Sequence, residues 1–381
     1  MVMKQMFSWE QRKVGDISSV VGGGTPNTNN PKYWDGNIDW YAPAEMEGKI
    51  YASNSERKIT KDGLKNSSAK LLPANRTILF TSRAGIGKSA ILTKISATNQ
   101  GFQSLVLNDN IDAYFVYSLT PILKEKAESI ASGSTFLEIS GKMLSNIRII
   151  IPDGKEQQRV GLFFESIDNL ITLHQRKCEK LQDLKKGLLE KMFPADGSDK
   201  PQIRFKGFTE AWEQREIKDI AERFDNLRIP VAASQRESGT IPYYGANGIQ
   251  DYVNGFTHNG EFVLVAEDGA NDLKNYPVQY VNGKIWVNNH AHVLQSNKNN
   301  STMFLKYLIG SADIESLLVG GGRAKLNAEV LMSIDLILPN KDEQKQIAIF
   351  FDRLDSLITL HQRKCEKLKN LKKALLQKMF A

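Results

Sequence analysis

Residues 170–181 read L-I-T-L-H-Q-R-K-C-E-K-L, and residues 357–368 read the same twelve letters. The match extends in both directions at a constant offset of 187 positions. When Pro152–Phe193 is compared with Pro339–Phe380, 26 of 42 positions are identical. Self-similarity over this length indicates that the chain contains two copies of one structural unit.

A fainter repeat lies upstream of each copy of this segment. The letters W-E-Q-R occur at 9–12 and again at 212–215. Each occurrence is followed shortly by Asp-Ile, at 16–17 and at 219–220. Each copy therefore begins and ends with a shared segment.

The two copies differ in the bodies that these shared segments enclose. The copies span roughly 8–196 and 204–381, and the breaker-rich stretch P-A-D-G-S-D-K-P (194–201) between them is typical of a linker. Body one carries G-G-G-T-P-N-T-N-N-P-K-Y-W (22–34), whereas body two carries I-P-Y-Y-G-A-N-G-I-Q-D-Y (241–252). Shared arms with different bodies predict a scaffold that presents two different recognition surfaces.

The repeated segment is predicted to be a long helix. It contains no proline from Gln157 to Met192, and strong helix formers dominate its composition. Apolar or weakly polar residues recur at steps of three and four, the pattern of a seam that packs on a partner helix. In the two copies the predicted seam residues are Phe164, Ile167, Ile171, His174, Cys178, Leu181, Phe351, Leu354, Ile358, His361, Cys365 and Leu368.

Such a helix cannot bury its seam alone, so the second copy at 344–379 is the expected partner within the chain. Antiparallel packing would place the two bodies at opposite ends, related by approximate two-fold symmetry. The predicted fold is therefore α/β, with two recognition bodies joined by a long antiparallel two-helix coiled coil. The alternative is that each helix packs on another protein. Both arrangements can hold together, because Phe163 and Leu170 widen the apolar stripe beyond a two-strand seam.

Length and composition are those of a soluble globular protein with two or three domains. The chain has 381 residues, of which 41% are hydrophobic and 24% charged. Its net charge of +7 is a mild excess that is compatible with a nucleic-acid partner without requiring one. The sequence shows no signal-peptide pattern, no apolar run long enough to span a membrane, and too few cysteines for a disulfide framework. The expected location is the cytoplasm.

The stretch T-S-R-A-G-I-G-K-S (81–89) follows the apolar run T-I-L-F (77–80) and resembles a phosphate-binding loop. That loop needs a glycine where Ser82 stands and a helix that begins at the lysine. Residues 90–98 instead alternate like a strand. Body two carries A-E-D-G-A (266–270) in the matching place, without a Gly-Lys pair. We therefore reject a nucleotide-binding role for this stretch.

Other catalytic patterns are incomplete. Asp39, Glu47 and Lys49 have the spacing of a metal-dependent nuclease set, but body two lacks this pattern, and unrelated loop charges are the simpler interpretation. His290 and His292 could face the same side of a strand, although half-buried histidines are more common there than a metal site. No catalytic residue is predicted.

A zinc site is a further possibility that the pattern does not favour. His174 and Cys178 lie four residues apart on one helical face, as do His361 and Cys365, and together they have Cys₂His₂ ligand types. Seam-filling side chains in a helical interface are the simpler interpretation. No metal site is predicted.

Both bodies carry aromatic, amide and basic side chains in glycine-rich turns, where a backbone can approach a duplex. Arg and Lys read guanine and Asn reads adenine in the major groove, and Lys and Arg also neutralise phosphate. Each such residue taken singly is more simply a solvated loop residue. The candidates for DNA contact are Lys32, Tyr33, Trp34, Ser82, Arg83, Lys88, Tyr243, Tyr244, Asn247, Asn288, Asn289, His290, Arg323 and Lys325.

Several motifs of the two bodies occur together in one known family. Body one carries G-G-G-T-P (22–26), N-P-K-Y-W-D-G-N-I-D-W (30–40), T-S-R-A-G-I-G (81–87) and N-Q-G-F-Q-S-L (99–105). Body two carries P-Y-Y-G-A-N-G-I-Q-D-Y (242–252), L-V-A-E-D-G-A (264–270) and N-N-H-A-H-V-L (288–294). In this order, and with the repeated helices, they resemble the specificity (S) subunits of type I restriction-modification systems.

The resemblance implies two α/β target recognition domains, each of which reads one half of a split, asymmetric site in double-stranded DNA. The conserved helices would set the unread spacer and dock two methyltransferase (modification) subunits, which bind S-adenosylmethionine and methylate an adenine in each half-site. Two restriction subunits would add translocation and cleavage driven by ATP with Mg. Cofactors and catalytic residues would then belong to the partners, and this chain would be non-catalytic.

The same resemblance predicts how the chain is divided. The expected segments are target recognition domain 1 at 1–152, a central conserved helix at 153–193, a linker at 194–203, target recognition domain 2 at 204–339 and a distal conserved helix at 340–381. Two competing classes stay open: an enzyme that uses 81–89 or the Asp39 set, and a coiled-coil adaptor that never touches DNA.

Overall fold

The chain forms two compact units in the computed structural model, which describes residues 9–83, 85–133, 137–195, 197–320 and 324–380. Unit 1 comprises Met1–Gln175 together with Arg363–Ala381, and unit 2 comprises Arg176–Gln362. Each unit therefore contains one body, the beginning of the helix that follows this body, and the end of the other copy's helix. The divisions after Gln175 and after Gln362 are equivalent positions within the repeated twelve-residue segment.

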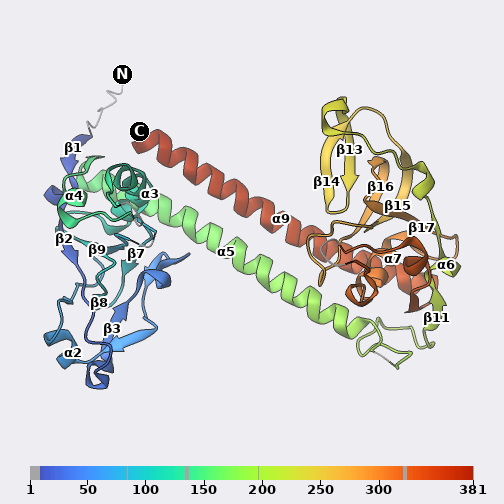
Figure 1. The fold of residues 1–381 in the computed structure, drawn as a ribbon, viewed down its shortest axis with the longest axis horizontal. Coiled ribbons are helices and arrows are strands. Elements are labelled where there is room, and N and C mark those ends of the chain that lie inside the picture. The colour runs from blue at the N-terminus through green and yellow to red at the C-terminus, as the bar shows by residue number, and fades with distance from the viewer. Residues whose placement is uncertain (1–8, 84, 134–136, 196, 321–323, 381) are drawn as a thin grey trace. The chain divides into compact units, whose positions relative to one another are not determined.

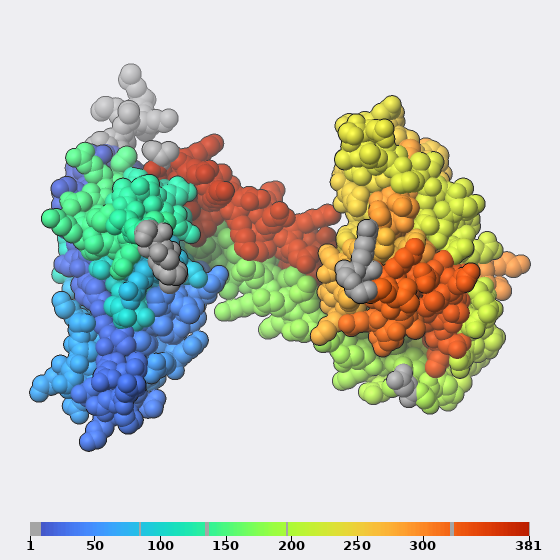
Figure 2. All heavy atoms as spheres, in the orientation of Figure 1, coloured from blue at the N-terminus to red at the C-terminus, as the bar shows by residue number. Residues whose placement is uncertain are grey.

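Body one is built on a five-stranded sheet in the order β2-β9-β6-β7-β4 and a three-stranded sheet in the order β5-β3-β8, and β1 and β10 form a separate two-stranded pair. The strand β3 of the three-stranded sheet, drawn in blue, lies toward one end of unit 1 (Figure 1), and blue side chains cover this end (Figure 2). The elements are β1 (Glu10–Lys13), α1 (Val14–Ile17), β2 (Ser18–Gly22), η1 (Pro31–Tyr33), β3 (Trp34–Tyr41), η2 (Pro43–Met46), β4 (Tyr51–Ala52), β5 (Arg57–Ile59), α2 (Lys61–Lys65), β6 (Thr77–Phe80), β7 (Ser89–Leu92), β8 (Ala97–Thr98), β9 (Gln103–Leu107), α3 (Ala113–Ile130), α4 (Gly141–Ser145) and β10 (Arg148–Ile151).

Body two contains one six-stranded sheet in the order β12-β17-β15-β16-β13-β14. The hairpin of β13 and β14, drawn in yellow, forms one tip of unit 2 (Figure 2). The elements are β11 (Glu213–Glu216), α6 (Ile217–Ile220), β12 (Ala221–Arg223), η3 (Asp225–Leu227), η4 (Ala233–Gln235), β13 (Ser238–Gly245), β14 (Gly248–Val253), β15 (His258–Ala266), β16 (Val278–Val287), β17 (Ala291–Ser296), α7 (Thr302–Gly310), η5 (Glu315–Leu317), α8 (Ala328–Met332) and β18 (Asp335–Leu338).

The two W-E-Q-R segments play the same structural role in both units. In unit 1, β1 pairs antiparallel with β10, the strand that directly precedes the long helix. In unit 2, β11 pairs in the same way with β18. Trp9 and Trp212, which open the two segments, both pack on aromatic side chains of their unit. The W-E-Q-R repeat in the sequence therefore corresponds to a repeated strand pair that connects the start of each body to the start of its long helix.

The prediction of two long helices is confirmed. The helix α5 spans Gly154–Met192 and α9 spans Lys341–Phe380, so each begins three residues earlier than predicted (Figure 1). Capping side chains explain these starts. Asp153 Oδ1 accepts a hydrogen bond from the Glu156 amide at 2.9 Å, and Asn340 Oδ1 accepts one from the Glu343 amide at 3.1 Å.

Within each unit, the beginning of one long helix packs against the end of the other. In unit 1, Phe164 of α5 shares a buried core with Leu376 and Phe380 of α9. In unit 2, Phe351 of α9 shares a core with Met192, the last residue of α5, and with Phe193 just beyond it. The pairing is antiparallel, as predicted. Among the predicted seam residues, the buried ones are Phe164, Ile167, Ile171, Phe351, Leu354, Ile358 and Cys365, whereas His174, Cys178, Leu181, His361 and Leu368 are half-buried.

The charge distribution along the helices favours this antiparallel arrangement. Residues 363–380 at the end of α9 contain seven Lys or Arg and one Glu, whereas residues 154–175 at the start of α5 contain two Lys or Arg and three Asp or Glu. Unit 1 therefore pairs a basic segment with a mildly acidic one. Parallel pairing would place the two basic ends side by side, with like charges facing each other.

The compact units cut across the predicted segment boundaries, because each long helix contributes to both units. The predicted boundaries themselves stay a prediction. The zinc hypothesis is divided in the same way: His174 and Cys365 belong to unit 1, and Cys178 and His361 to unit 2. Both cysteines are free thiols. Within the described part of the chain, no helix has the length and low charge that crossing a membrane requires.

Candidate nucleic-acid interface

The stretch 81–89 forms the turn of a β-hairpin. Strands β6 and β7 on either side of it pair antiparallel, and Phe80 lies opposite Ser89. Thr81 closes the turn, because its carbonyl accepts the Gly87 amide at 2.9 Å and its Oγ1 accepts the Lys88 amide at 2.9 Å. A phosphate loop would turn these amides toward a phosphate and continue into a helix. The strand predicted over 90–98 is confirmed in part: β7 spans Ser89–Leu92, and a separate short strand, β8, spans Ala97–Thr98.

The charged side chains near this turn have separate partners. Lys88 Nζ lies 2.7 Å from Glu47 Oε2, and this hydrogen bond and the lysine charge lower the pKa of the Glu47 carboxyl. Asp39 is buried and accepts hydrogen bonds from Ser55 N at 3.2 Å and Ser55 Oγ at 3.1 Å. Asp39 and Glu47 thus do not form the joint carboxylate pair that the nuclease interpretation requires.

Four predicted DNA-contact residues are buried: Trp34, Ser82, Tyr243 and Asn288. Trp34 packs edge-on against Trp40, with ring centroids 5.1 Å apart, so it belongs to the core of the three-stranded sheet. Their placement in glycine-rich turns suggested exposure, which packing overrides. We no longer assign these four side chains as direct DNA contacts, although they can position exposed neighbours.

Tyr243 shows how such a buried residue acts. Its hydroxyl accepts a hydrogen bond from Val231 N at 2.9 Å, and the Arg236 guanidinium lies 4.1 Å from its ring centroid. Arg236 in turn lies 3.5 Å from Asp251 on the neighbouring strand β14. Tyr243 therefore fixes the base of the hairpin that carries the half-buried Tyr244.

Asn247, Asn289, His290 and Lys325 of body two lie in one group of loops, residues 245–248, 267–271, 288–290 and 324–326, which we term the loop cluster. Asn247 joins the first two loops, because its Nδ2 donates to the Gly269 carbonyl at 2.8 Å and its Oδ1 accepts the Asn271 amide at 2.9 Å. The Glu267 amide donates to the His290 carbonyl at 2.9 Å, and the Leu326 amide donates to the Glu267 carbonyl at 2.8 Å. Backbone and amide bonds thus hold four separate loops as one surface.

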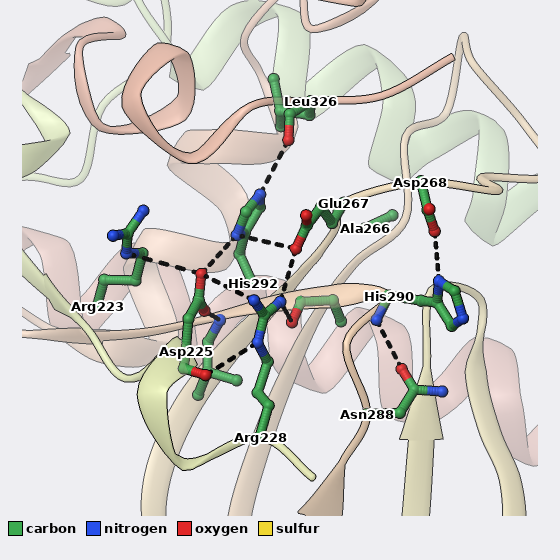
Figure 3. A network of polar contacts seen from close by, with 12 residues as sticks. Arg223, Asp225, Arg228, Ala266, Glu267, Asp268, Asn288, His290, His292 and Leu326 are labelled. Atoms are coloured by element: carbon green, nitrogen blue, oxygen red, sulfur yellow. Dashed lines mark hydrogen bonds and ion pairs between the residues drawn. The ribbon is translucent and has the colours of Figure 1, made fainter. Parts of the chain in front are cut away.

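An ion-pair network adjoins the loop cluster (Figure 3). Arg228 Nη1 is 2.7 Å from Glu267 Oε2, and Lys325 Nζ is 3.0 Å from Glu267 Oε1. His292, which is buried, places Nδ1 2.7 Å from Asp225 Oδ2 and Nε2 2.9 Å from the Leu326 carbonyl. Both ring nitrogens therefore face acceptors. The network connects the loop residues Glu267, Lys325 and Leu326 to His292 and Arg228.

The electrostatics of this network keep both carboxylates ionised. Burial alone would raise the pKa of the Asp225 carboxyl, but hydrogen bonds from His292 and the Val293 amide, together with the Arg228 charge, lower it. Burial would also raise the pKa of the Glu267 carboxyl. Hydrogen bonds from Arg228 and Lys325 outweigh this effect, so the pKa of Glu267 is lowered. The carboxylates are stabilised by the cations of the chain itself.

Three residues of the network, Asp225, Glu267 and His292, have side chains of the types that bind metal ions. The ligand atoms of Asp225, Glu267 and His292 lie within 4.8 Å of one another. However, both Glu267 oxygens already accept from cationic side chains, Arg228 and Lys325. A divalent cation would have to displace them and would meet their repulsion. We therefore interpret the group as an ion-pair network.

The surface of the loop cluster carries groups that can contact a duplex. Asn289 is exposed, and His290 and Lys325 are 36% and 47% exposed. Asp268 Oδ1 lies 2.5 Å from His290 Nδ1, which orients the imidazole and leaves Nε2 as its second hydrogen-bonding atom. Arg323 lies outside the described residues.

In body one the corresponding candidates are divided between two sheets. Lys32 and Tyr33 lie in η1, which leads into the three-stranded sheet, whereas Arg83 and Lys88 lie on the β6–β7 turn of the five-stranded sheet. Lys32 is exposed, and the other three are half-buried. The role of all these residues in DNA contact stays a prediction.

A family model for the type I restriction modification DNA specificity domain matches this chain twice, at residues 6–183 and at 209–370. The chain belongs to this family. The two matched regions correspond to the two copies of the internal repeat.

Relatives of known name agree with this membership. The type I restriction enzyme MjaIX specificity subunit of Methanocaldococcus jannaschii is 26% identical over 401 aligned positions, which cover 97% of this chain and 92% of that protein. A putative type I restriction enzyme specificity subunit of Haemophilus influenzae is 43% identical over 145 residues, 38% of each chain. The crystal structure of a type I restriction-modification S subunit from M. genitalium has the same fold, with a TM-score of 0.72 at 14% identity over 100% of this chain and 98% of that one.

Two residues of the ion-pair network could not be identified from the sequence of this specificity-family member. Arg228 and Asp225 stand in a stretch without any motif, and their partners lie 39 and 67 residues away. His292 was predicted to be a half-buried histidine, and it is fully buried as part of the network. A signal for the network would require knowing that β15 and β17 are neighbours, which the strand pattern does not reveal.

Proposed function

We propose that this chain is the non-catalytic DNA-reading subunit of a type I restriction-modification complex. Body one and body two each read one half of a split, asymmetric site in double-stranded DNA. The paired helices α5 and α9 set the length of the unread spacer between the halves and dock the methyltransferase subunits.

One observation carries this proposal: the two units repeat the same helices and the same body-to-helix ties but enclose different bodies. A single symmetric reader would need two equal bodies, and a single asymmetric reader would not need a repeat. Body one has a five-stranded and a three-stranded sheet, whereas body two has one six-stranded sheet. Two different sequences, read at a fixed separation, match this construction.

The outer faces of the helices support the docking of two equivalent partners. In unit 1, Leu162, Leu170 and Leu173 of α5 are 63%, 45% and 46% exposed. In unit 2, the equivalent residues of α9 are similarly exposed: Ile349, Leu357 and Leu360. Apolar patches of this kind mark protein interaction sites. Because the patches occur once per unit, we infer one methyltransferase subunit on each.

The chemistry of the complex is assigned to those partners. The methyltransferase subunits bind S-adenosylmethionine and methylate an adenine in each half-site, and two restriction subunits supply translocation and cleavage that use ATP and Mg. This assignment is supported by the hairpin geometry of 81–89, whose amides at Gly87 and Lys88 are occupied by Thr81.

The experiment is to change the helix without changing the bodies. A four-residue insertion after Leu181 adds one helical turn, about 6 Å, which corresponds to roughly one to two base pairs of duplex. Methylated adenines are then mapped genome-wide in cells that carry the complex. We expect a longer spacer with both half-site sequences unchanged, and the same insertion after the exposed Gly197 of the linker serves as the control.

Two results would contradict this function. A changed half-site sequence after the insertion would show that the helices are not a ruler. DNA binding by the complex that is absent or independent of sequence would favour a coiled-coil adaptor. The enzyme alternative predicts ATP turnover by the isolated chain that Lys88→Ala abolishes, and we expect no turnover in either protein.

A further inference from the structure

The strongest unexplained feature of both units is a carboxylate, buried in unit 1 and half-buried in unit 2, that joins three separate elements. In unit 1 this is Asp168 of α5, which is 6% exposed. Lys372 Nζ of α9 lies 2.6 and 2.7 Å from its two oxygens, and the Tyr114 hydroxyl of α3 donates to Oδ2 at 2.9 Å. One side chain therefore ties both helices to body one.

The same construction occurs in unit 2. Asp355 of α9 is equivalent to Asp168 and accepts from Lys185 Nζ of α5 at 2.6 Å. The Tyr307 hydroxyl of α7 donates to Asp355 at 3.0 Å, and Lys306 Nζ of the same helix lies 2.7 Å from it. We term each group a clamp: Tyr114, Asp168 and Lys372 in unit 1, and Lys185, Lys306, Tyr307 and Asp355 in unit 2.

In each clamp, some residues belong to the repeated helical segment and others belong to the bodies, which are not repeated. The Asp–Lys pair comes from the repeated segment, whereas each body supplies its tyrosine separately. Tyr114 is the second residue of α3, and Tyr307 is the sixth residue of the shorter α7. Two bodies with unlike sequences and sheets thus place a tyrosine hydroxyl on equivalent carboxylates of the repeated helices. A simple need for packing would not require a shared hydrogen bond.

Burying a carboxylate and a lysine is costly, so a stabilising role is a weak explanation for the clamps. An apolar pair of similar size would often hold the helices together equally well or better. What a hydrogen-bonded charge cluster provides is direction, because the donors fix the angle at which body and helix meet. Packing by apolar side chains alone leaves this angle less strictly defined.

From this geometry we propose that Asp168 and Asp355 are positioning residues that fix the angle of each recognition body on the helix pair and thereby restrict the DNA spacer to one length. The inference rests on the proposed function. The half-site sequences are read by the bodies themselves and do not depend on the clamps.

The two clamps differ in a way that sharpens the prediction. Body one reaches its carboxylate through the Tyr114 hydroxyl, with its oxygen within 2.9 Å, whereas body two uses both Tyr307 and Lys306. Removing one hydroxyl should therefore loosen unit 1 more than unit 2. Tyr114→Phe and Tyr307→Phe keep the rings in place and are not expected to prevent folding.

The test uses the complex with its methyltransferase subunits and a DNA library in which the two half-sites are separated by spacers of varied length. For Tyr114→Phe we expect the methylation rate at spacers one base pair too long or too short, relative to the native spacer, to rise about tenfold, as the loss of a hydrogen bond to a charged group implies. Tyr307→Phe should give a smaller rise, and Tyr307→Phe combined with Lys306→Met should match Tyr114→Phe. Tyr41→Phe, which alters a ring in the separate core that Tyr41 shares with Met46 and Leu79 of body one, is the control.

The outcomes separate the inference from the proposed function. If the unaltered complex methylates no split site, the proposed function fails. If the unaltered complex has a fixed spacer and Tyr114→Phe and Asp168→Asn leave the spacer preference unchanged, the clamps are merely structural and the inference is overturned. A wider spacer range with unchanged half-sites supports it, and Tyr114→Phe provides the result should Asp168→Asn fail to fold.

Discussion

Replacing Phe164 by alanine should loosen body one and also the last helical segment of the chain, residues 363–380, and should leave unit 2 unchanged. The Phe164 side chain is fully buried, and its ring lies 6.3 Å from that of Phe380 at the end of α9. Its core also contains Phe115 of body one. The matched variant is Phe351→Ala, because Phe351 occupies the equivalent position in unit 2.

The size of the effect follows from the burial of this ring. Truncating a fully buried phenylalanine to alanine costs roughly 3–5 kcal/mol, because transfer energy is lost and a cavity remains. At about 1.4 kcal/mol per tenfold change, amides that exchange by opening of unit 1 should exchange about a hundred- to several-thousand-fold faster. Phe351→Ala should have the same effect on unit 2.

Hydrogen exchange followed by mass spectrometry measures this segment by segment. For Phe164→Ala we expect faster exchange in body one and in residues 363–380, and for Phe351→Ala in body two and in residues 176–192. The reasoning is refuted if Phe164→Ala accelerates exchange in the beginning of α9 instead of its end. Such a result would mean that the helices do not pair antiparallel within each unit.

Three further predictions concern charged groups. Arg204 donates twice to Glu343, which is fully buried, so Arg204→Ala should destabilise the protein by roughly 3–5 kcal/mol in urea unfolding, whereas a loss below about 1 kcal/mol would contradict a buried pair. Burial would raise the pKa of the Asp355 carboxyl, but Lys306 and Lys185 lower it below its ordinary value of 3.8. The stability that the ionised carboxyl contributes is therefore present above about pH 4 and is lost as the pH falls through the lowered pKa. Acid titration of unfolding should show a smaller loss of stability at low pH for Asp355→Asn than for the unaltered protein. Lys88→Ala breaks an exposed pair and should change stability by less than about 1 kcal/mol while lowering the salt dependence of DNA binding by about one ion, and an unchanged salt slope would remove Lys88 from the interface.

The helices could be predicted from the sequence because their signal is local and repeated. The period of three and four residues across Gln157–Met192 determines a helix without knowledge of its partner. The repeat then supplied the partner, and Phe164 and Phe351 are buried as expected. Only the capping residues that start each helix earlier, such as Asp153, lay outside this pattern.

The candidate site could be predicted only in part, because burial depends on contacts between distant segments. Trp34 stands in a turn-rich stretch that suggests exposure, yet the Arg57 guanidinium lies 3.6 Å from its ring centroid and Trp40 packs edge-on against it. Lys372 would be solvated on an isolated helix, and it becomes the half-buried partner of Asp168 only in the folded unit. Such pairs are set by tertiary structure, for which a single sequence carries no direct signal.

The exchange of helix ends between the copies also has a consequence for synthesis on the ribosome. Phe380 packs against Trp9 and Phe115, so the core of unit 1 is incomplete until α9 has been made. Body one therefore leaves the ribosome first, but its core is completed last. The apolar residues that pack on the end of α9 stay exposed while body two is translated. A nascent chain of this kind needs protection from aggregation during that interval, and slowing translation within body two should lower its soluble yield.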